Sequence, residues 1–372
     1  MRRTKLLFFV TEDWYFCSHR LPLAVAAKEA GFDMVVVTRV REHGEIIREA
    51  GLRLIPFENL RSGINPLREF WSLVRLIRLY RRERPDVVHH VAMKPVLYGS
   101  IAARMVGTPH VINALAGMGW LFTSGAGLAR WFKPAVRWAL GRLLRSGVAL
   151  VQNPDDVRLL VQLGVPESKI RRIAGSGVDL QRFHPQPEPD GVPVVVLPAR
   201  LLWDKGVREF VSAARQIKQQ GIAARFVLAG EPDQLNPAAI SPDQIADWIN
   251  ECVVEHLGWV DDMPKLLAKC HIVCLPSYRE GLPKSLIEAA AASRPIVTTD
   301  VPGCCEVVRD GDNGLLVPPR DADALAEALA RLITDPELRQ QMGARGRARA
   351  EQEFGLETVI QKTLALYAEA AA

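Results

Sequence analysis

The chain has 372 residues, of which 48% are hydrophobic and 24% charged, a composition typical of a water-soluble protein with room for two domains. No apolar run reaches the ~20 residues that span a bilayer. The short apolar stretch after Arg2 and Arg3 is soon interrupted by Glu12 and Asp13, unlike a signal peptide, so we expect a cytoplasmic protein. Six cysteines show neither a disulfide framework nor metal-ligand spacing, and we expect small core residues.

The net charge of +5 conceals an asymmetry between the two halves of the chain. Residues 1–190 hold 28 Lys and Arg against 17 Asp and Glu, whereas residues 191–372 hold 19 against 25. A basic half predicts contact with a polyanionic surface, either nucleic acid or anionic lipid.

Apolar stretches at residues 5–11 and 32–38 predict two buried strands, with a helix over residues 21–30 between them. Such a βαβ opening predicts a parallel sheet with right-handed crossovers. The loop expected at residues 12–20 has no glycine, which excludes a dinucleotide-binding fingerprint. This loop follows a strand, at the edge where open α/β sheets bind ligands. Either it is simply solvated, or its polar and aromatic side chains bind a polar acceptor. Those side chains are Asp13, Trp14, Tyr15, Ser18, His19 and Arg20.

Two amphipathic basic helices are predicted in the same half. In the first, which begins near Pro66, we expect Leu67, Phe70 and Trp71 to pack in the core beneath a solvated face of arginines. The second covers residues 128–145 and interleaves tryptophan and phenylalanine with arginine and lysine. Cationic helices with large aromatic side chains are typical of proteins that lie on anionic membranes, and we predict membrane contact for the second.

Two further segments of this half follow predicted strands. Lys94 comes shortly after a strand that ends near His90. A strand at residues 110–114 runs into a glycine-rich loop that contains Gly117 and Gly119 and could close over an acceptor. The loop lacks the lysine and hydroxyl of a P-loop, so a nucleoside triphosphate site is not expected there.

A proline-rich segment at residues 185–193 has no hydrophobic periodicity and is the best linker in the chain. A second βα series follows it. We therefore predict two Rossmann-like, doubly wound α/β domains that face a central cleft, an acceptor domain at 1–185 and a donor domain at 186–355, with helix 356–372 packing back on the first. The expected strands of the second series are residues 194–197, 225–229, 256–260, 271–276, 296–299 and 314–317, and its expected helices are 208–219, 242–255, 262–269, 321–334 and 336–354.

The segment at residues 280–288, E-G-L-P-K-S-L-I-E, follows the apolar strand at 271–276 and predicts a turn into a helix. Free N–H groups at a helix start bind anions, and Glu280 and Glu288 frame this one. Arg200 and Lys205 follow the strand at 194–197, where two cations can neutralise a diphosphate and the charge that develops as it leaves. An ordinary acidic helix start and a surface ion pair are the plain alternatives.

These motifs, with L-A-G-E at 228–231, G-W-V at 258–260 and N-G-L-L-V-P-P at 313–319, resemble the retaining GT-B glycosyltransferases of the family 4 type. The resemblance implies a nucleotide-sugar donor, with a UDP-sugar as the expected donor, and no metal or other cofactor. It implies that Arg200 and Lys205 bind the diphosphate while Glu280 and Glu288 hold the sugar and the ribose. The other donor-binding positions that it implies are Glu231, Trp259, Val260, Gly281, Leu282 and Pro283.

The segments W-Y-F-C-S-H-R-L-P, V-H-H-x-x-x-K-P and A-G-M-G-W-L-F-T are similar to bacterial members that extend polyprenyl-diphosphate-linked saccharides. That resemblance implies peripheral attachment to the cytoplasmic face of the inner membrane through helix 128–145, and no nucleic acid. Many relatives have a glycine-rich first loop and a histidine after the strand matching 111–113, which this chain lacks, so His19, His89 or no side chain could assist the acceptor. The acceptor-binding positions that it implies are His19, Arg20, Lys94, Gly117 and Gly119.

Three alternatives remain at this point. A sugar-nucleotide 2-epimerase would have the same fold and donor but no lipid acceptor. A nucleic-acid-binding regulator would use the basic half, although no motif for entering a groove is present. A module that only binds its ligand would need no catalytic groups.

Overall fold

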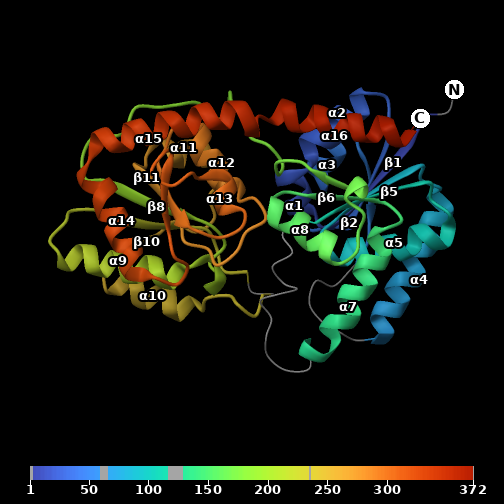
Figure 1. Cartoon of the computed structure of the whole chain (residues 1–372), viewed down its shortest axis with the longest axis horizontal. Helices are drawn as coiled ribbons and strands as arrows, with labels where there is room; N and C mark the ends of the chain where they lie inside the picture. The colour runs from blue at the N-terminus through green and yellow to red at the C-terminus, as the bar shows by residue number, and fades with distance from the viewer. Residues whose placement is uncertain (1–2, 59–65, 116–128, 234–235, 372) are drawn as a thin grey trace. The chain divides into compact units, whose positions relative to one another are not determined.

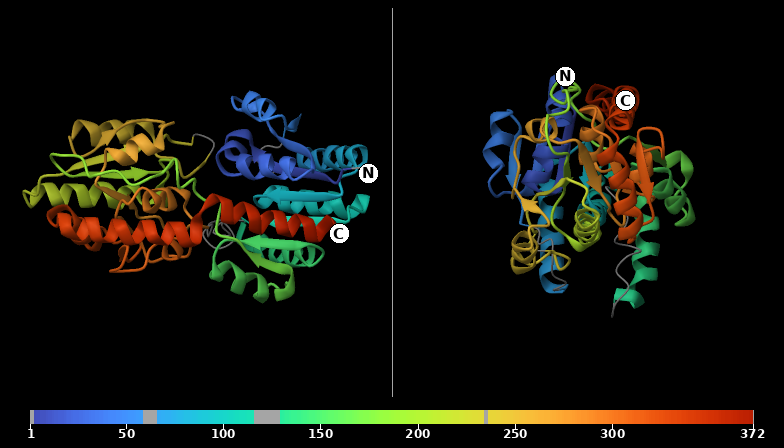
Figure 2. Two further views of the ribbon diagram at one scale, coloured as in Figure 1. Left: turned by 90° about the horizontal axis from the view of Figure 1, so that it is seen from above. Right: turned by 90° about the vertical axis from the view of Figure 1, so that its left-hand side faces the viewer.

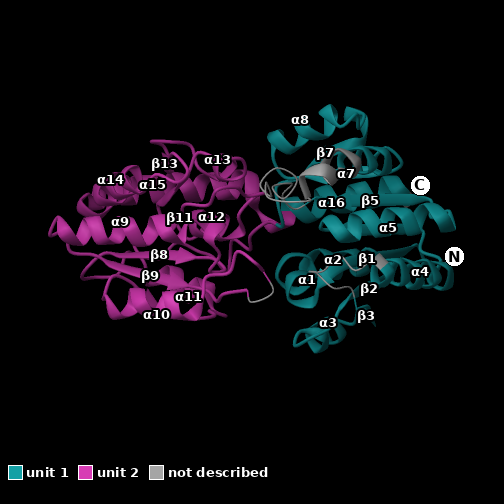
Figure 3. Cartoon of the chain, turned by 90° about the horizontal axis from the view of Figure 1, so that it is seen from below, with its two compact units in different colours: residues 1–176, 358–372 teal, residues 177–357 magenta. Residues whose placement is uncertain are grey.

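The computed structural model describes residues 3–58, 66–115, 129–233 and 236–371. The chain divides into two compact units (Figure 3): residues 1–176 with 358–372 form the first, and residues 177–357 form the second. The second unit thus begins before the predicted linker at 185–193. Each unit is a parallel sheet with helices on both faces (Figure 1), which confirms the predicted α/β fold class.

The first unit contains a seven-stranded parallel sheet in the order β3-β2-β1-β4-β5-β6-β7. Its strands are β1 (Lys5–Glu12), β2 (Asp33–Arg39), β3 (Arg53–Pro56), β4 (Val87–Val91), β5 (His110–Ala114), β6 (Val148–Val151) and β7 (Ile170–Arg172). Its helices are α1 (Asp13–His19), α2 (Leu21–Glu29), α3 (Gly44–Glu49), α4 (Pro66–Glu83), α5 (Met93–Val106), α7 (Ala129–Leu144), α8 (Pro154–Gln162) and the 3-10 turn η1 (Glu167–Lys169).

Side chains of β1 alternate between two apolar layers. Leu6 and Phe8 pack in one layer, with α2 and the end of the C-terminal helix. Leu7 and Phe9 pack in the other, with α4 and α5. A strand buried on both faces needs an unbroken apolar run, and this explains why residues 5–11 could be recognised as a parallel strand.

The prediction of a loop at residues 12–20 is wrong, because β1 continues to Glu12 and α1 occupies Asp13–His19. Asp13 is fully buried, and its Oδ2 accepts hydrogen bonds from the backbone N–H groups of Arg41 and His43 at 2.6 and 3.0 Å. The carboxylate therefore joins α1 to the turn after β2. These hydrogen bonds occupy an oxygen that was predicted to bind a ligand.

The second unit contains a six-stranded parallel sheet in the order β10-β9-β8-β11-β12-β13. Its strands are β8 (Val194–Pro198), β9 (Arg225–Ala229), β10 (Glu255–His256), β11 (Ile272–Leu275), β12 (Ile296–Thr299) and β13 (Gly314–Val317). Its helices are η2 (Trp203–Lys205), α9 (Val207–Gln219), α10 (Pro242–Asn250), α11 (Met263–Ala268), α12 (Lys284–Ala291), α13 (Cys304–Val307), α14 (Ala322–Thr334), α15 (Pro336–Arg349) and the π-turn η3 (Ala350–Phe354).

Two boundaries in this unit differ from the sequence prediction. The helix expected at 242–255 ends at Asn250, and the strand expected at 256–260 is only β10, so Trp259 and Val260 follow the strand instead of forming it. Cys252 adopts a positive φ of 53° just after α10, a conformation that ends a helix.

The last helix, α16 (Leu356–Ala371), returns to the first unit, where residues 358–372 belong. Figure 2 shows its red end against the strands of that unit. Leu366 and Tyr367 pack in the same layer as Phe8, and the Tyr367 hydroxyl lies 2.6 Å from His89 Nδ1 in β4.

Among the described residues, no helix is both long and apolar enough to span a bilayer. Cys270, Cys274 and Cys304 are buried thiols, as expected for small core residues, whereas Cys252 is exposed.

Candidate active site

The loop after β8 brings Lys205 to the end of β11. Lys205 closes the 3-10 turn η2, and Gly206 follows with a left-handed φ of 72°. A Cβ on Gly206 would lie 2.0 Å from the carbonyl oxygen of Pro276, so only glycine permits this close approach. The loop is thereby held against the segment that leads to Glu280.

Glu280, the predicted centre of the site, lies in the segment between β11 and α12. Its Oε1 accepts hydrogen bonds from Lys205 Nζ at 2.5 Å and from Ser277 Oγ at 2.6 Å. Its side chain is mostly buried, which strengthens the ion pair relative to one in water. One carboxylate oxygen is thus fixed by two donors, and the carboxylate orientation follows from the fold.

Gly303 packs against the backbone of the turn that carries Glu280, and the sequence analysis did not identify it. It has a φ of 85°, and a Cβ there would lie 2.7 Å from the carbonyl oxygens of both Glu280 and Gly281. The Glu280 N–H donates to the Pro302 carbonyl at 3.2 Å. The adjacent P-G pair was the only signal in the sequence, and it predicts a turn without naming its partner.

Helix α12 begins at Lys284, within the segment where the sequence predicts a turn into a helix, with Pro283 in the N-cap position. The Pro283 carbonyl accepts from the N–H groups of Leu286 and Ile287 at 3.1 and 3.3 Å. The N–H groups of Lys284 and Ser285 precede these bonds, at the positive end of the helix dipole. Leu282 and Pro283 are themselves buried beneath the turn.

Glu288 lies in the second turn of α12, and its side chain is almost completely buried. Burial raises the pKa of this carboxyl group above its ordinary value, while Lys284 and Arg182 act in the opposite direction. Lys284 Nζ lies 3.4 Å from Glu288 Oε1. The oxygens of this buried carboxylate can accept hydrogen bonds, which suits a ligand that donates hydroxyl hydrogens.

The remaining predicted donor residues lie after the ends of β8, β9 and β10. Arg200 Nη1 pairs with Asp233 Oδ2 at 2.5 Å. Glu231 follows β9, and its Oε1 lies 2.7 Å from the position that a Cβ on Gly258 would take. Trp259 is exposed, and its Nε1 donates to Asp261 at 2.6 Å. Val260 is half-buried beside it.

In the first unit, the predicted acceptor residues that the structure describes make separate contacts. His19 ends α1 and stacks on Tyr15 with ring centroids 4.2 Å apart. Lys94, in α5, pairs with Glu69 Oε1 of α4 at 2.9 Å. Arg20 is buried between α1 and α2. Gly117 and Gly119 lie outside the described residues.

The two histidines of β4 point to opposite faces of the sheet. His89 contacts Tyr367, and burial, with Arg20 nearby, holds the pKa of its imidazole well below the usual value. His90 bonds to Asn113 Oδ1 at 2.8 Å and to the Tyr80 hydroxyl at 3.0 Å, and burial lowers its pKa to about 4. Both imidazoles are therefore neutral near pH 7.

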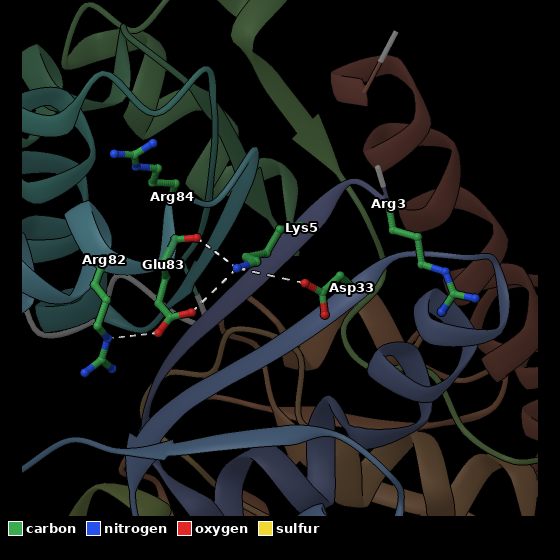
Figure 4. Close-up of a pocket in the computed structure, with 6 residues that line it drawn as sticks. All are labelled: Arg3, Lys5, Asp33, Arg82, Glu83 and Arg84. Atoms are coloured by element: carbon green, nitrogen blue, oxygen red, sulfur yellow. Dashed lines mark hydrogen bonds and ion pairs between the residues drawn. The ribbon is translucent and has the colours of Figure 1, made fainter. Parts of the chain in front are cut away.

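A cluster of charges at the start of β1 offers no comparable site (Figure 4). Lys5 Nζ donates to the Glu83 backbone carbonyl at 2.9 Å and lies 3.6 Å from its carboxylate, while Arg82 Nε lies 3.1 Å from the same carboxylate. This cluster lies at the amino end of β1, opposite the edge where open α/β sheets bind ligands. Both of its carboxylates, Asp33 and Glu83, already lie in ion pairs with Lys5 or Arg82.

No group of three or more His, Cys, Asp or Glu side chains suited to a metal ion occurs in the described part of the chain. The chemistry that the second unit offers is electrostatic: two cations, the start of a helix and two carboxylates near the carboxyl edge of one sheet. Such an arrangement can stabilise a departing diphosphate while it orients sugar and ribose hydroxyls.

Two family models match the chain. A family model described as glycosyl transferases group 1 matches residues 180–349, and one described as glycosyl transferase 4-like matches residues 5–145. The chain belongs to the group 1 glycosyltransferases. As a member of that family it is a retaining glycosyltransferase that uses a nucleotide-sugar donor, which confirms the predicted enzyme class and family resemblance.

Curated relatives span nearly the whole glycosyltransferase. The N,N'-diacetylbacillosaminyl-diphospho-undecaprenol alpha-1,3-N-acetylgalactosaminyltransferase of Campylobacter jejuni is 29% identical over 94% of both chains. The UDP-Gal:alpha-D-GlcNAc-diphosphoundecaprenol alpha-1,3-galactosyltransferase of Escherichia coli is 25% identical over 82% of this chain and 81% of the relative.

Solved structures share its fold. Anabaena HepE in complex with UDP-glucose superposes with a TM-score of 0.79 at 19% identity, covering 99% of this glycosyltransferase and 100% of HepE. The sucrose-phosphate synthase of Thermosynechococcus elongatus gives a TM-score of 0.82 at 21% identity, covering 100% of both chains. These likenesses confirm the GT-B fold.

Proposed function

We propose that this glycosyltransferase moves a hexose or N-acetylhexosamine from a UDP-sugar to a saccharide carried on a polyprenyl diphosphate. The contact between Lys205 and Glu280 carries the donor half of the proposal, because it holds a cation and a sugar-binding carboxylate 2.5 Å apart at the start of α12. The two curated relatives, whose names specify undecaprenyl-diphosphate saccharides, support the acceptor half.

The donor diphosphate would lie against Arg200, Lys205 and the first N–H groups of α12. Arg200 and Lys205 each hold an acidic partner, so phosphate oxygens would replace or share those ion pairs. Glu280 would accept from hydroxyls of the transferred sugar, and Glu288 from those of the ribose. Glu231, Trp259 and Val260 would border the nucleoside, and Gly281, Leu282 and Pro283 would shape the turn beneath the phosphate.

The transfer would retain the configuration of the sugar by reaction on one face. The acceptor hydroxyl oxygen bonds to the anomeric carbon as the bond from that carbon to the β-phosphate oxygen breaks. The departing phosphate oxygen takes the hydroxyl proton, so the step needs no side-chain base and, in this proposal, no metal ion. Lys205 and Arg200 would stabilise the charge that develops on the diphosphate.

A lipid-linked acceptor would require contact with the cytoplasmic membrane face, and α4 and α7 support such contact. The prediction that Leu67, Phe70 and Trp71 pack in the core is wrong, since all three are exposed on the first turns of α4. That helix packs instead through its second half, where Leu76 and Tyr80 are buried. Trp138 of α7 is 73% exposed, and Arg78, Arg81 and Arg82 of α4 are exposed as well.

The direct test incubates the full chain with a panel of UDP- and GDP-sugars and a short-chain polyprenyl-diphosphate saccharide, and follows nucleoside diphosphate release. We expect release from a UDP-sugar that requires the lipid acceptor and is unchanged by a chelator. Donor consumption without acceptor, or conversion of the donor to its epimer, would replace the transferase with a 2-epimerase. Activity that a chelator abolishes and magnesium restores would contradict metal independence alone.

A further inference from the structure

We propose that Arg20 binds the diphosphate of the lipid-linked acceptor. This inference rests on the proposed function and names the residue that would recognise the charge of the acceptor. Arg20 stands between α1 and α2, both of which follow β1 at the carboxyl edge of the first sheet. Only 6% of its surface is exposed. Burying a guanidinium group lowers the stability of the fold unless the charge is paired, so the groups around Arg20 indicate its role.

Two neighbours of Arg20, His89 and Tyr367, are side chains without charge. Its guanidinium lies close enough to His89 and Tyr367 to influence the titration of both. His89 is bonded through Nδ1 to the Tyr367 hydroxyl and stacks on Phe8, with ring centroids 4.8 Å apart. Because burial keeps the imidazole and the phenol neutral, neither can balance the guanidinium.

The two other arginines buried in the described chain are compensated, and Arg20 is not. Arg339 pairs with Glu188 at 2.9 Å, and Arg294 donates to the carbonyl oxygens of residues 187, 267 and 268. Within the described residues, Arg20 has no ion-pair partner, and its Nε has no hydrogen-bond partner. His89 Nε2 is also buried without a partner there. A cation and an imidazole nitrogen thus remain unsatisfied beside each other.

The start of α2 reinforces the preference for an anion. Helix α2 has nine residues and begins directly after Arg20, so the positive end of its dipole lies beside the guanidinium. Guanidinium groups bind phosphate oxygens through two parallel hydrogen bonds, which suits a diphosphate better than a neutral sugar hydroxyl.

The other polar side chains of the predicted acceptor set are less suited to bind a diphosphate. Lys94 already pairs with Glu69, and His19 stacks on Tyr15. Arg200 and Lys205 belong to the second unit, where the donor diphosphate would occupy them. An acceptor that carries its own diphosphate needs a separate cation, and among the buried arginines of the described residues Arg20 is the one without a compensating partner.

The test compares two acceptors that carry the same saccharide, one on a short-chain polyprenyl diphosphate and one on an uncharged alkyl chain. A hydrogen bond to a charged group contributes roughly 1.5–3 kcal/mol. In Arg20→Met we therefore expect the ratio of kcat/KM for the charged acceptor over the uncharged one to fall at least ~10-fold. Arg104→Met, which removes an exposed arginine of α5, should leave that ratio unchanged.

Thermal unfolding gives a second reading that needs no turnover. With UDP saturating the donor site, inorganic pyrophosphate should raise the Tm of the natural chain and of Arg104→Met but not of Arg20→Met. Without ligand, Arg20→Met should unfold at the same temperature as the natural chain or higher, because an uncompensated buried charge has been removed.

The opposite results would overturn the inference. An Arg20→Met protein with a lowered Tm, an equal loss with both acceptors and unchanged stabilisation by pyrophosphate would make Arg20 a structural residue. If the natural chain transfers sugar to neither acceptor, the proposed function fails. The pyrophosphate shift and its dependence on Arg20 then still decide whether the anion site exists.

Discussion

The orientation of the Glu280 carboxylate depends on two neighbouring side chains. Lys205 and Ser277 both donate to Oε1, and Ser277 is itself fully buried next to β11. The same lysine would contact the donor phosphate, so the carboxylate and the diphosphate share one cation. Their positions are therefore linked through Lys205.

Ser277→Ala should weaken catalysis more than binding. Loss of one hydrogen bond of about 1 kcal/mol should lower kcat about 5-fold while the KM for the donor changes little, because the carboxylate and its lysine remain. Steady-state kinetics would measure this, with Ser146→Ala, an exposed serine, as the control. A larger KM with unchanged kcat would show that Ser277 acts on donor binding instead.

The sequence identified the glutamates and cations because these residue types recur at strand ends, but it could not pair them. Lys205 and Glu280 are 75 residues apart, and their contact depends on Gly206 lying against Pro276. The ion pair between Arg200 and Asp233 was also missed, because no local pattern connects the ends of β8 and β9. The roles assigned to these residues come from the family resemblance.

At the scale of elements, the turn into α12 is held by backbone contacts as much as by side chains. Gly303, just before α13, approaches the carbonyl oxygens of residues 280 and 281. Any side chain there would displace the turn that carries Glu280.

Gly303→Ala should therefore impair the site in a folded protein. The substitution adds a Cβ 2.7 Å from two carbonyl oxygens at a φ of 85°. We expect kcat/KM to fall about 5- to 150-fold, for a strain of roughly 1–3 kcal/mol. Gly311→Ala is the matched control, because its φ is 71° and no atom lies within 4 Å of the new Cβ. Equal activity of the two variants would remove Gly303 from the site.

Strand β4 makes the first unit sensitive to acid. The folded pKa of His90, about 4, lies below the ordinary value near 6.5, and that of His89 is also lowered. Well above pH 6.5 both imidazoles are neutral in the folded and in the unfolded chain, so they do not lower the free energy of unfolding. Below it, the unfolded chain binds protons that the folded chain excludes, so stability falls until the pH reaches the folded pKa.

Hydrogen exchange of the β4 amides can measure this effect. From pH 7.5 to 5.5, the opening free energy should fall by about 1.4 kcal/mol for each histidine, about 3 kcal/mol in total. His90→Gln should show about half that loss. An opening free energy that does not change over this range would mean that the histidines titrate normally.

The strands were predictable because parallel strands buried on both faces need continuous apolar runs, as at residues 5–11 and 271–276. Helix α1 was not, because D-W-Y-F-C-S-H lacks an N-cap hydrogen bond and a helical apolar stripe, and Asp13 stabilises it through the distant segment 41–43. The expected strand at 256–260 contains Gly258 at a φ of 67°, which leaves the extended conformation.

At the scale of the whole molecule, α4 and α7 are the helices that would make the proposed contact with a membrane. Figure 1 shows both helices extending past the sheet of the first unit on the same side. The exposed face of α4 changes along its length from Leu67, Phe70 and Trp71 to a series of arginines. Aromatic insertion together with arginine attraction favours anionic lipid.

Co-sedimentation with vesicles should detect this surface. The full chain should bind vesicles that contain anionic lipid, bind neutral vesicles less, and lose affinity at high salt, because part of the attraction is electrostatic. Phe70→Ser with Trp71→Ser should weaken binding at least ~10-fold, by the loss of two apolar anchors. The exposed control Ile249→Ser in the second unit should bind normally. Equal binding by both variants would exclude α4.

The central claim is that Glu280 and its neighbours form the catalytic centre, and a single-turnover measurement of Glu280→Gln tests it most directly. With saturating UDP-sugar and lipid-linked acceptor, the transfer rate should fall about 100-fold or more, while UDP binding measured by calorimetry stays within a few-fold of the natural chain. Glu251→Gln, which removes an exposed ion pair with Arg215, is the control. A transfer rate within threefold of the natural chain would place the catalytic centre elsewhere.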